Sequence, residues 1–466
     1  MNIVEKFFNP LLSFNQKDLK GEVPPIKDLY LRTLKIAWPS ALEGVLISLI
    51  SAVDLIMVGS IGKEAISAVG ICNQPRFICL SPIFASTTAA IVLIARRKGE
   101  GNQKAANDFL RVALCWSFIF ALIFCGLSFV FAREILSFAG AQADYIDIAV
   151  EYYRIVVSSL FLFSLGNTMS GAQRGAGYTK ISMITNLSAN IVNIILNAIL
   201  INGLLGFPKL GVKGAAIATA IGNTVAFIIA LISLLQKNNY LSLNLKAIDD
   251  FKDKTKRYFN IFKSAFSEQI IVRFGFFVYA KVVASLGTAE FAAHQICMNI
   301  ITINFALGDG LQTANTSLVG QSLGAKRSDL AIIYSKIAQT VGVCFAILNA
   351  IVVFIFSKQI LNIFTNDPVV IGLADIPMKI ICFIVFFQIL QVITIGALRG
   401  AGDVKFVTFM MLICVGIIRP GVSYLLVYPL NMGLVGAWLG VLIDQASRAI
   451  YSLIRFKKGS WVNIKV

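Results

Sequence analysis

The sequence predicts an all-α membrane protein with twelve transmembrane helices arranged as two six-helix bundles. Of its 466 residues, 57% are hydrophobic and 14% are charged, and the mean hydropathy is +0.79. Soluble domains average about 25% charged residues. The apolar residues gather into twelve runs, each long enough to cross about 30 Å of hydrocarbon at 1.5 Å per helical residue. The second half of the chain also repeats motifs of the first half, which indicates a duplicated bundle.

The order of the runs divides the chain into five parts. These are an N-terminal segment (1–32), a first lobe of six helices (33–236), a polar linker (237–259), a second lobe of six helices (260–455) and a tail (456–466). The predicted helices lie near 33–58, 64–95, 107–132, 145–172, 180–203, 212–236, 260–285, 290–320, 330–357, 369–397, 404–428 and 432–455.

The N-terminal segment is polar and has no apolar core ahead of a small-residue cleavage site, so it does not read as a secretory signal. Its apolar residues fit either an interfacial helix on the cytoplasmic face or a loosely ordered tail. These residues are Phe7, Phe8, Leu11, Leu12 and Phe14.

Basic residues predict how the chain lies in the membrane. The net charge is +17, and Lys and Arg concentrate in the N-terminal segment, the linker, the tail and alternate short loops such as Arg96-Arg97-Lys98. The positive-inside rule therefore places both termini in the cytoplasm of a multi-pass plasma-membrane protein. We expect no nucleic-acid partner, because basic and aromatic residues do not interleave as base stacking requires.

The cysteines and the motif search argue against a metal centre or an enzyme. All eight cysteines lie in apolar runs, and none is spaced as CxxC or stands beside the single His. We expect them to be small core residues. The sequence has no intramembrane Ser/His pair, HExxH motif or Walker A motif, so we expect no enzymatic activity, no cofactor and no direct use of ATP.

The two halves repeat each other at a nearly constant offset. Arg174-Gly175-Ala176-Gly177 recurs 225 residues later as Arg399-Gly400-Ala401-Gly402, and Glu43 and Glu268 share this offset. Because each half has an even number of helices, the repeat is parallel, which predicts a solute path between two rocking lobes. The glycines predict left-handed or closely packed backbone just past a helix end, with the Arg at the cytoplasmic interface.

Several polar residues interrupt the apolar runs. A charge near the middle of a membrane helix costs at least about 2.5–3.5 kcal/mol, so Asp54 in the first helix is expected to handle an ion, a proton or a substrate. Glu43 lies nearer the helix start and equally fits an interfacial position. Asn193 and Asn197 are four residues apart and share a helix face. Their oxygens, the Thr219 hydroxyl and the Asp54 carboxylate suit Na⁺, or Asp54 exchanges a proton.

These residues resemble the multidrug and toxic compound extrusion (MATE) transporters over about residues 30–455. The resemblance rests on the segments Trp38–Glu43, Val53-Asp54, Val58-Gly59, Arg174–Gly177, Ala292–Ile296, Leu318–Ala325 and Arg399–Gly402. It implies two six-helix bundles facing a central cavity. It also implies export of organic cations and other amphipathic compounds against an inward flow of Na⁺ or H⁺.

The resemblance also implies roles for single residues. Asp54 is similar to the first-helix aspartate that binds the coupling ion, and Asn193, Asn197 and Thr219 match the polar cluster around it, which would hold Na⁺ in a Na⁺-coupled member. Many relatives carry Asp at the position of Asn197. Our hypothesis is that Asn197, which carries no charge, weakens Na⁺ binding relative to an Asp at this position. The site then suits H⁺ as the coupling ion at least as well as Na⁺. Pro39 is similar to a first-helix proline tied to bending of that helix.

The second lobe departs from one subgroup of the family. Gln388 stands where some relatives carry a tenth-helix Asp that binds a cation, so a cation site in this lobe stays open. Glu268 and Arg273 could form an intramembrane ion pair that lines the cavity or locks the lobe. Asp309, between two glycines, fits either a cavity position or an inter-helix bond. With Glu43, these are the candidates for lining a substrate cavity.

The sequence therefore predicts a secondary active antiporter that exports cationic or amphipathic small molecules in exchange for H⁺ or Na⁺ by alternating access. The alternative is a flippase for lipid-linked or other large amphiphilic substrates, which would favour more spans and several cationic cavity residues. Small molecules and membrane lipid are the expected partners. The fold can work as a monomer.

Overall fold

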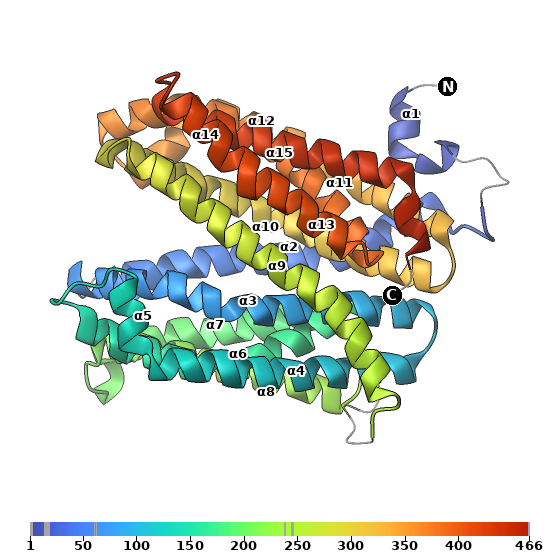
Figure 1. Cartoon of the computed structure of the whole chain (residues 1–466), viewed down its shortest axis with the longest axis horizontal. Coiled ribbons are helices and arrows are strands. Elements are labelled where there is room, and N and C mark those ends of the chain that lie inside the picture. The colour runs from blue at the N-terminus through green and yellow to red at the C-terminus, as the bar shows by residue number, and fades with distance from the viewer. Residues whose placement is uncertain are drawn as a thin grey trace. The chain divides into compact units, whose positions relative to one another are not determined.

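The computed structural model describes residues 3–13, 19–59, 61, 63–236, 239–243 and 247–464. Over these residues the chain forms helices and no strand, as the sequence predicts (Figure 1). The chain divides into two compact units. The N-terminal unit comprises Val45–Lys98 and Asn102–Phe266, and the C-terminal unit comprises Met1–Gly44, Gly99–Gly101 and Ser267–Val466.

The N-terminal unit packs long apolar helices around one core. Its helices are α3 (Lys63–Gly99), α4 (Gln103–Val130), α5 (Ala132–Phe138), α6 (Ile146–Gly175), α7 (Thr179–Asn202), the 3₁₀ helix η3 (Leu204–Gly206) and α8 (Gly211–Leu235), with the second part of α2 (Ile26–Gly59) and the first part of α9 (Phe251–Ala284). Helix α6 lies against α4 and α8, and α8 lies against α7. Fully buried side chains such as Ile83, Leu136 and Val157 fill the space between the helices.

The C-terminal unit is organised around α12. Besides the remaining parts of α2 and α9, its elements are α1 (Ile3–Phe8), the 3₁₀ helix η1 (Pro10–Ser13), α10 (Thr288–Gly324), α11 (Ser328–Phe364), α12 (Pro368–Gly400), α13 (Val404–Met411), the π-helix η4 (Leu412–Ile418), α14 (Arg419–Val427), α15 (Gly433–Lys458) and the 3₁₀ helix η5 (Ser460–Asn463). Helix α12 lies against α10, α11 and α15.

The boundaries between the two units fall inside the long helices α2 and α9. The predicted lobes, 33–236 and 260–455, instead consist of whole predicted helices. Helix α2 divides after Gly44 because its first part packs closely on α10. A Cβ placed on Gly310 would lie 2.7 Å from the Ala37 carbonyl oxygen, and one on Gly44 would lie 3.0 Å from the Ala306 Cβ. Glycine at these two positions lets the helix backbones approach each other.

Nine helical spans within the described residues are long and apolar enough to cross a membrane. Three of the twelve predicted spans, carried by α2, α9 and α15, are not among them. Two of these carry charges inside the helix: α9 holds Glu268, Arg273 and Lys281, and α15 holds Asp444 and Arg448. Part of α2 lies outside the described side chains.

The repeated Arg-Gly-Ala-Gly turns have the predicted backbone in both units. Gly177 and Gly402 follow a helix end with φ of +83° and +90°. At the preceding glycines the packing is tight, since a Cβ on Gly175 would lie 2.6 Å from the Ile91 carbonyl oxygen. A Cβ on Gly400 would meet the Thr316 carbonyl oxygen at 2.3 Å. Left-handed turns and close helix packing therefore explain why glycine stands at these positions.

The N-terminal segment contains a short helix that docks on the C-terminal unit. The Phe7 carbonyl accepts a hydrogen bond from the Thr340 hydroxyl at 2.9 Å, and the Phe8 carbonyl accepts one from the Tyr30 hydroxyl at 2.9 Å. Leu11 packs against the apolar core of this unit. Phe14 lies outside the described residues.

Six of the eight cysteines are buried, as predicted for core residues. Cys115 on α4 and Cys344 on α11 are exposed instead, so the prediction is wrong for these two. Both belong to helices that are long and apolar enough to span a membrane.

Candidate functional site

The polar cluster predicted in the first lobe forms between α7 and α8. The Asn193 amide donates a hydrogen bond to the Thr219 hydroxyl at 3.3 Å, and the Asn197 amide donates one to the Asn193 carbonyl oxygen at 3.2 Å. Both asparagines are buried, and Thr219 is half-buried. The four-residue spacing places both amides on one face of α7, so three predicted residues form one continuous polar group.

Gly222 on α8 allows this approach. A Cβ at Gly222 would lie 3.0 Å from the Ala189 carbonyl oxygen and 3.3 Å from the Asn193 Cβ. The glycine therefore brings α8 close enough for Thr219, one turn earlier, to reach Asn193. Gly222 was not predicted from the sequence, although its position three residues after Thr219 is a usable signal.

Asp54, the predicted ion-binding carboxylate, lies on the helical backbone of α2 in the N-terminal unit. Its side chain lies outside the described residues. The cluster of Asn193, Asn197 and Thr219 belongs to this unit as well. The assignment of Asp54 to the cluster stays a prediction.

Pro39 and Glu43 lie in the part of α2 that belongs to the C-terminal unit. Pro39 is inside the helix, where proline removes one backbone hydrogen bond and favours a bend. Glu43 is buried, with 8% of its surface exposed.

In the C-terminal unit, Glu268 forms an ion pair with the arginine of the repeated turn. The Arg399 Nη2 lies 2.5 Å from the Glu268 Oε1, and the Glu268 side chain is 5% exposed. The sequence suggested Arg273 as the partner of Glu268, five residues along the same helix. The ion pair that the structure shows joins α9 to α12 instead, because Arg399 comes from a neighbouring helix and can face the carboxylate directly.

The other three cavity candidates lie in three different helices. Gln388 is 5% exposed in α12, and its side-chain carbonyl oxygen has no hydrogen-bond partner among the described residues. Asp309 is half-buried in α10 next to Gly310, at which α10 contacts the first part of α2. Arg273 is half-buried in α9.

A second buried charge cluster lies in the C-terminal unit, around Asp444. The Asp444 carboxylate on α15 is fully buried and pairs with Arg448 Nη2 at 2.7 Å, as the four-residue spacing predicts. It also pairs with Arg419 Nη2 at 2.6 Å. The Arg419 guanidinium lies over the Phe276 ring at 4.4 Å. Two guanidinium groups thus share one carboxylate among α9, α14 and α15.

The single histidine lies in an aromatic contact group close to this cluster. The His294 ring lies 5.5 Å from the Tyr279 ring and 5.4 Å from the Trp438 ring, between centroids. All three side chains are buried, and Arg419 lies over Tyr279 at 5.8 Å. These ring contacts give His294 a packing role in the described part of the C-terminal unit.

Comparison with known families gives one consistent result. The MatE family model matches the chain twice, over residues 39–199 and 265–425. The two matches begin 226 residues apart, close to the offset of the repeated motifs, and confirm the predicted duplication.

Relatives that the chain covers almost completely are described as multidrug resistance proteins or as a transporter. The chain is 29% identical to "Probable multidrug resistance protein NorM" of Thermotoga maritima over 449 residues, covering 95% of this chain and 94% of the relative. It is 26% identical to "Uncharacterized transporter YisQ" of Bacillus subtilis over 430 residues, covering 92% and 94%. "Multidrug resistance protein NorM" of Vibrio vulnificus is 26% identical over 428 residues, covering 89% and 92%.

Solved structures share the fold. A structure described as "Outward-facing conformation of a multidrug resistance MATE family transporter of the MOP superfamily" has a TM-score of 0.87 at 19% identity, covering 96% of this chain and 98% of the other. A second, a MOP superfamily transporter from Pyrococcus furiosus, also has a TM-score of 0.87 at 20% identity, covering 94% and 97%. These likenesses confirm the predicted fold class.

Proposed function

The chain belongs to the MATE family of multidrug efflux transporters, and from that premise we propose that it is a secondary active antiporter. It exports organic cations or other amphipathic compounds in exchange for H⁺ or Na⁺. It does so in the plasma membrane, as a monomer with both termini in the cytoplasm. Relatives described as multidrug resistance proteins support the substrate class.

The polar cluster between α7 and α8 carries the proposal. Two buried amides and a hydroxyl lie within hydrogen-bond distance of one another in helices that are otherwise strongly apolar. Oxygens gathered in this way can coordinate a hard cation or accept a hydrogen bond from a protonated carboxylate, which supports a bound ion or proton at this place. Asp54 on α2 supplies the negative charge in this proposal.

The composition of the cluster favours a weakly charged site. Asn193, Asn197 and Thr219 offer only neutral oxygen ligands, so Asp54 is the single carboxylate in the proposed ion site. Na⁺ would coordinate these oxygens with the carboxylate. With a proton, the same oxygens would form hydrogen bonds to a neutral Asp54. We expect H⁺ to replace Na⁺ more readily in this site than in a site with two carboxylates, because this site carries less negative charge.

The proposed cycle couples this ion to the substrate. Asp54 takes up the ion from outside, and loss of its charge lets α2 change its bend near Pro39, which favours release of substrate. Opening to the cytoplasm releases the ion and allows substrate to reload. The coupling requires that ion and substrate favour different conformations or exclude each other.

Efflux of a fluorescent organic cation from proteoliposomes tests the proposal. A pH gradient and a Na⁺ gradient are imposed separately, and we expect one of them to drive efflux. The gradient that does so identifies the coupling ion. Asn193→Leu removes a hydrogen-bonding group from the site and should slow gradient-driven efflux by roughly 10-fold or more, the effect of losing one hydrogen bond to a charged group.

Asn223→Leu is the matched control. Asn223 lies on α8 one turn beyond Thr219, and its amide donates to the Ser159 hydroxyl of α6 at 2.9 Å rather than to the cluster. Equal slowing by both variants would contradict the proposed site. If the wild-type protein moves no cation with either gradient but flips a fluorescent lipid-linked compound, the flippase alternative replaces the antiporter.

A further inference from the structure

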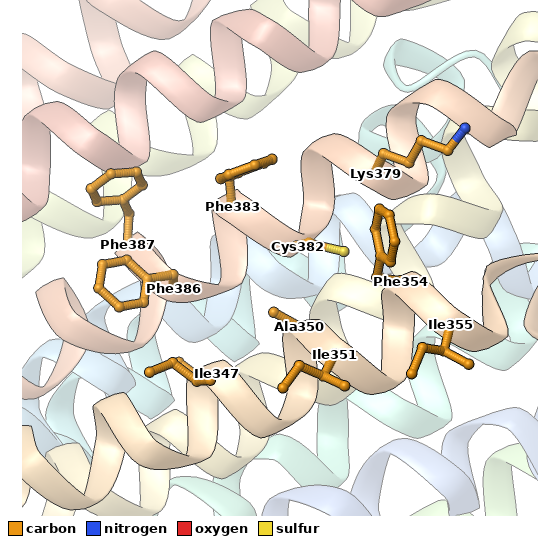
Figure 2. A pocket seen from close by; sticks show the side chains of 11 residues that line it. Ile347, Ala350, Ile351, Phe354, Ile355, Lys379, Cys382, Phe383, Phe386 and Phe387 are labelled. Atoms are coloured by element: carbon orange, nitrogen blue, oxygen red, sulfur yellow. The ribbon is translucent and has the colours of Figure 1, made fainter.

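An open groove lies between α11 and α12 in the C-terminal unit (Figure 2). Its volume is about 650 Å³, within the range of sites that hold drug-sized ligands. Small side chains, Ala350 and Cys382, lie between the two helices, and larger ones flank them: Ile351 and Phe354 from α11 and Phe383 from α12. The groove is therefore hollow where the side chains are small and walled where they are large.

The walls of the groove face outward. Phe354 is 62% exposed and Phe383 is 64% exposed, although both lie in spans with a mean hydropathy of 2.4. An apolar patch of this kind on a membrane-spanning helix faces hydrocarbon rather than water. The natural occupant of the groove is therefore part of a lipid molecule.

The position of the charges along α12 sets the depth of the groove. Lys379 and Arg399 enclose the uncharged run 380–398, which is 19 residues long and spans about 28 Å, close to the hydrocarbon thickness. Lys379 therefore lies at the membrane interface opposite to Arg399. The groove runs along α12 from Lys379 to Phe387, which is about 12 Å, so it extends through roughly one leaflet.

A cation and an anion stand together at the interfacial end of the groove. The Lys379 ammonium lies 2.8 Å from the Asp375 carboxylate, and the two side chains are 51% and 31% exposed. An ion pair this exposed adds little stability by itself, so both groups remain accessible to a ligand. A headgroup that carries a phosphate beside a primary ammonium complements the pair, with its phosphate on Lys379 and its ammonium on Asp375.

We propose that this groove binds one phospholipid of the phosphatidylethanolamine class, with an acyl chain between α11 and α12 and the headgroup on Lys379 and Asp375. Phosphatidylcholine fits less well because its quaternary ammonium has no N–H to donate to Asp375. Phosphatidylglycerol has no cation for Asp375. This lipid site is separate from the proposed ion site and does not depend on the export function.

Native mass spectrometry of the full chain tests the proposal. The protein is purified from vesicles that contain equal amounts of phosphatidylethanolamine and phosphatidylcholine with identical acyl chains. We expect one retained phosphatidylethanolamine per chain, preferred by roughly tenfold, the ratio expected from one charge-assisted hydrogen bond. Asp375→Ala should abolish the preference, because Asp375 is the group that accepts hydrogen bonds from the primary ammonium. Lys379→Ala should weaken retention of both lipids, which carry the same phosphate, and Ala350→Phe, which fills the groove, should abolish retention.

Two matched variants serve as controls. Lys358→Ala removes an exposed lysine of α11 that does not line the groove. Leu348→Phe enlarges an exposed side chain of α11 that does not line the groove either. Both should retain the lipid as the wild type does. Equal retention of the two lipids, or an intact preference in Asp375→Ala, would mean ordinary surrounding lipid and overturn the proposal. A dimer that disappears in Ala350→Phe would assign the groove to a second copy instead.

Discussion

Asp444 is the carboxylate that two buried arginines of the C-terminal unit share. It is fully buried and neutralises one of two arginines, Arg419 and Arg448, that have little contact with solvent. Removing one partner of a buried ion pair leaves an uncompensated charge, which costs about 3–5 kcal/mol. The second arginine makes the loss more severe here, because both guanidinium groups would then lack their carboxylate.

We therefore expect Asp444→Asn to lower the thermal stability of the purified protein in detergent strongly, with a loss of about 3–5 kcal/mol. Asp147→Asn is the control, because Asp147 forms an exposed pair with Arg133 at 2.8 Å and such pairs contribute about 0–1 kcal/mol. Melting curves of the two variants give the comparison. A smaller effect for Asp444→Asn than for Asp147→Asn would refute this account of the cluster.

At this scale the sequence predicts pairs within a helix better than pairs between helices. The Asp444–Arg448 pair follows from the four-residue spacing, and the Asn193–Asn197 contact follows from the same rule. The partners Arg399 and Arg419 come from other helices. Their contacts depend on which helices pack together and in what rotation, which no local spacing encodes.

At the scale of the elements, the two Arg-Gly-Ala-Gly turns fix how closely helices approach. Gly400 of α12 stands where a Cβ would collide with the Thr316 carbonyl oxygen of α10, and Gly175 of α6 has the equivalent contact with Ile91 of α3. Overpacking a core position costs typically about 1–3 kcal/mol. Backbone atoms are the obstacle here, and these cannot move aside as a flexible side chain would.

Gly400→Ala and Gly175→Ala are therefore expected to destabilise the protein by about 1–3 kcal/mol. Gly372→Ala, in the same helix α12, is the control, because no atom lies within 4 Å of a Cβ there. It should be neutral or stabilising by about 0.5–1 kcal/mol, since alanine favours a helix. Fluorescence-detected size-exclusion chromatography after heating ranks the variants, and equal survival of Gly400→Ala and Gly372→Ala would exclude a packing role.

The elements themselves were predicted from apolar runs and glycine turns, and their irregularities were not. The π-helix 412–418 lies between α13 and α14, and a Cβ on Gly275 of α9 would lie 2.3 Å from the Val415 carbonyl oxygen within it. This wide turn immediately precedes Arg419. An apolar run such as 404–428 fits a regular helix equally well, because the extra residue of a π turn is set by packing against α9 rather than by composition.

At the scale of the whole chain, duplication is the property that explains most of the others. The MatE match occurs once in each half, and the repeated glycines have the same backbone role in both units. The halves have diverged in their polar residues. Both units bury ion pairs, that of Asp108 in the N-terminal unit and those of Glu268 and Asp444 in the C-terminal unit. The N-terminal unit also holds the neutral cluster of Asn193, Asn197 and Thr219, which supports the proposal that this unit binds the coupling ion.

Gradient-driven efflux by the Asp54→Asn variant tests that claim most directly. The variant and the wild type are reconstituted in parallel, and binding of the same fluorescent cation is measured on each purified protein. The account predicts that Asp54→Asn binds the cation but no longer responds to the gradient that drives the wild type. Efflux by Asp54→Asn at the wild-type rate and with the wild-type gradient dependence would contradict it and move the coupling site to the C-terminal unit, where Glu43 and Glu268 are the buried carboxylates to test next.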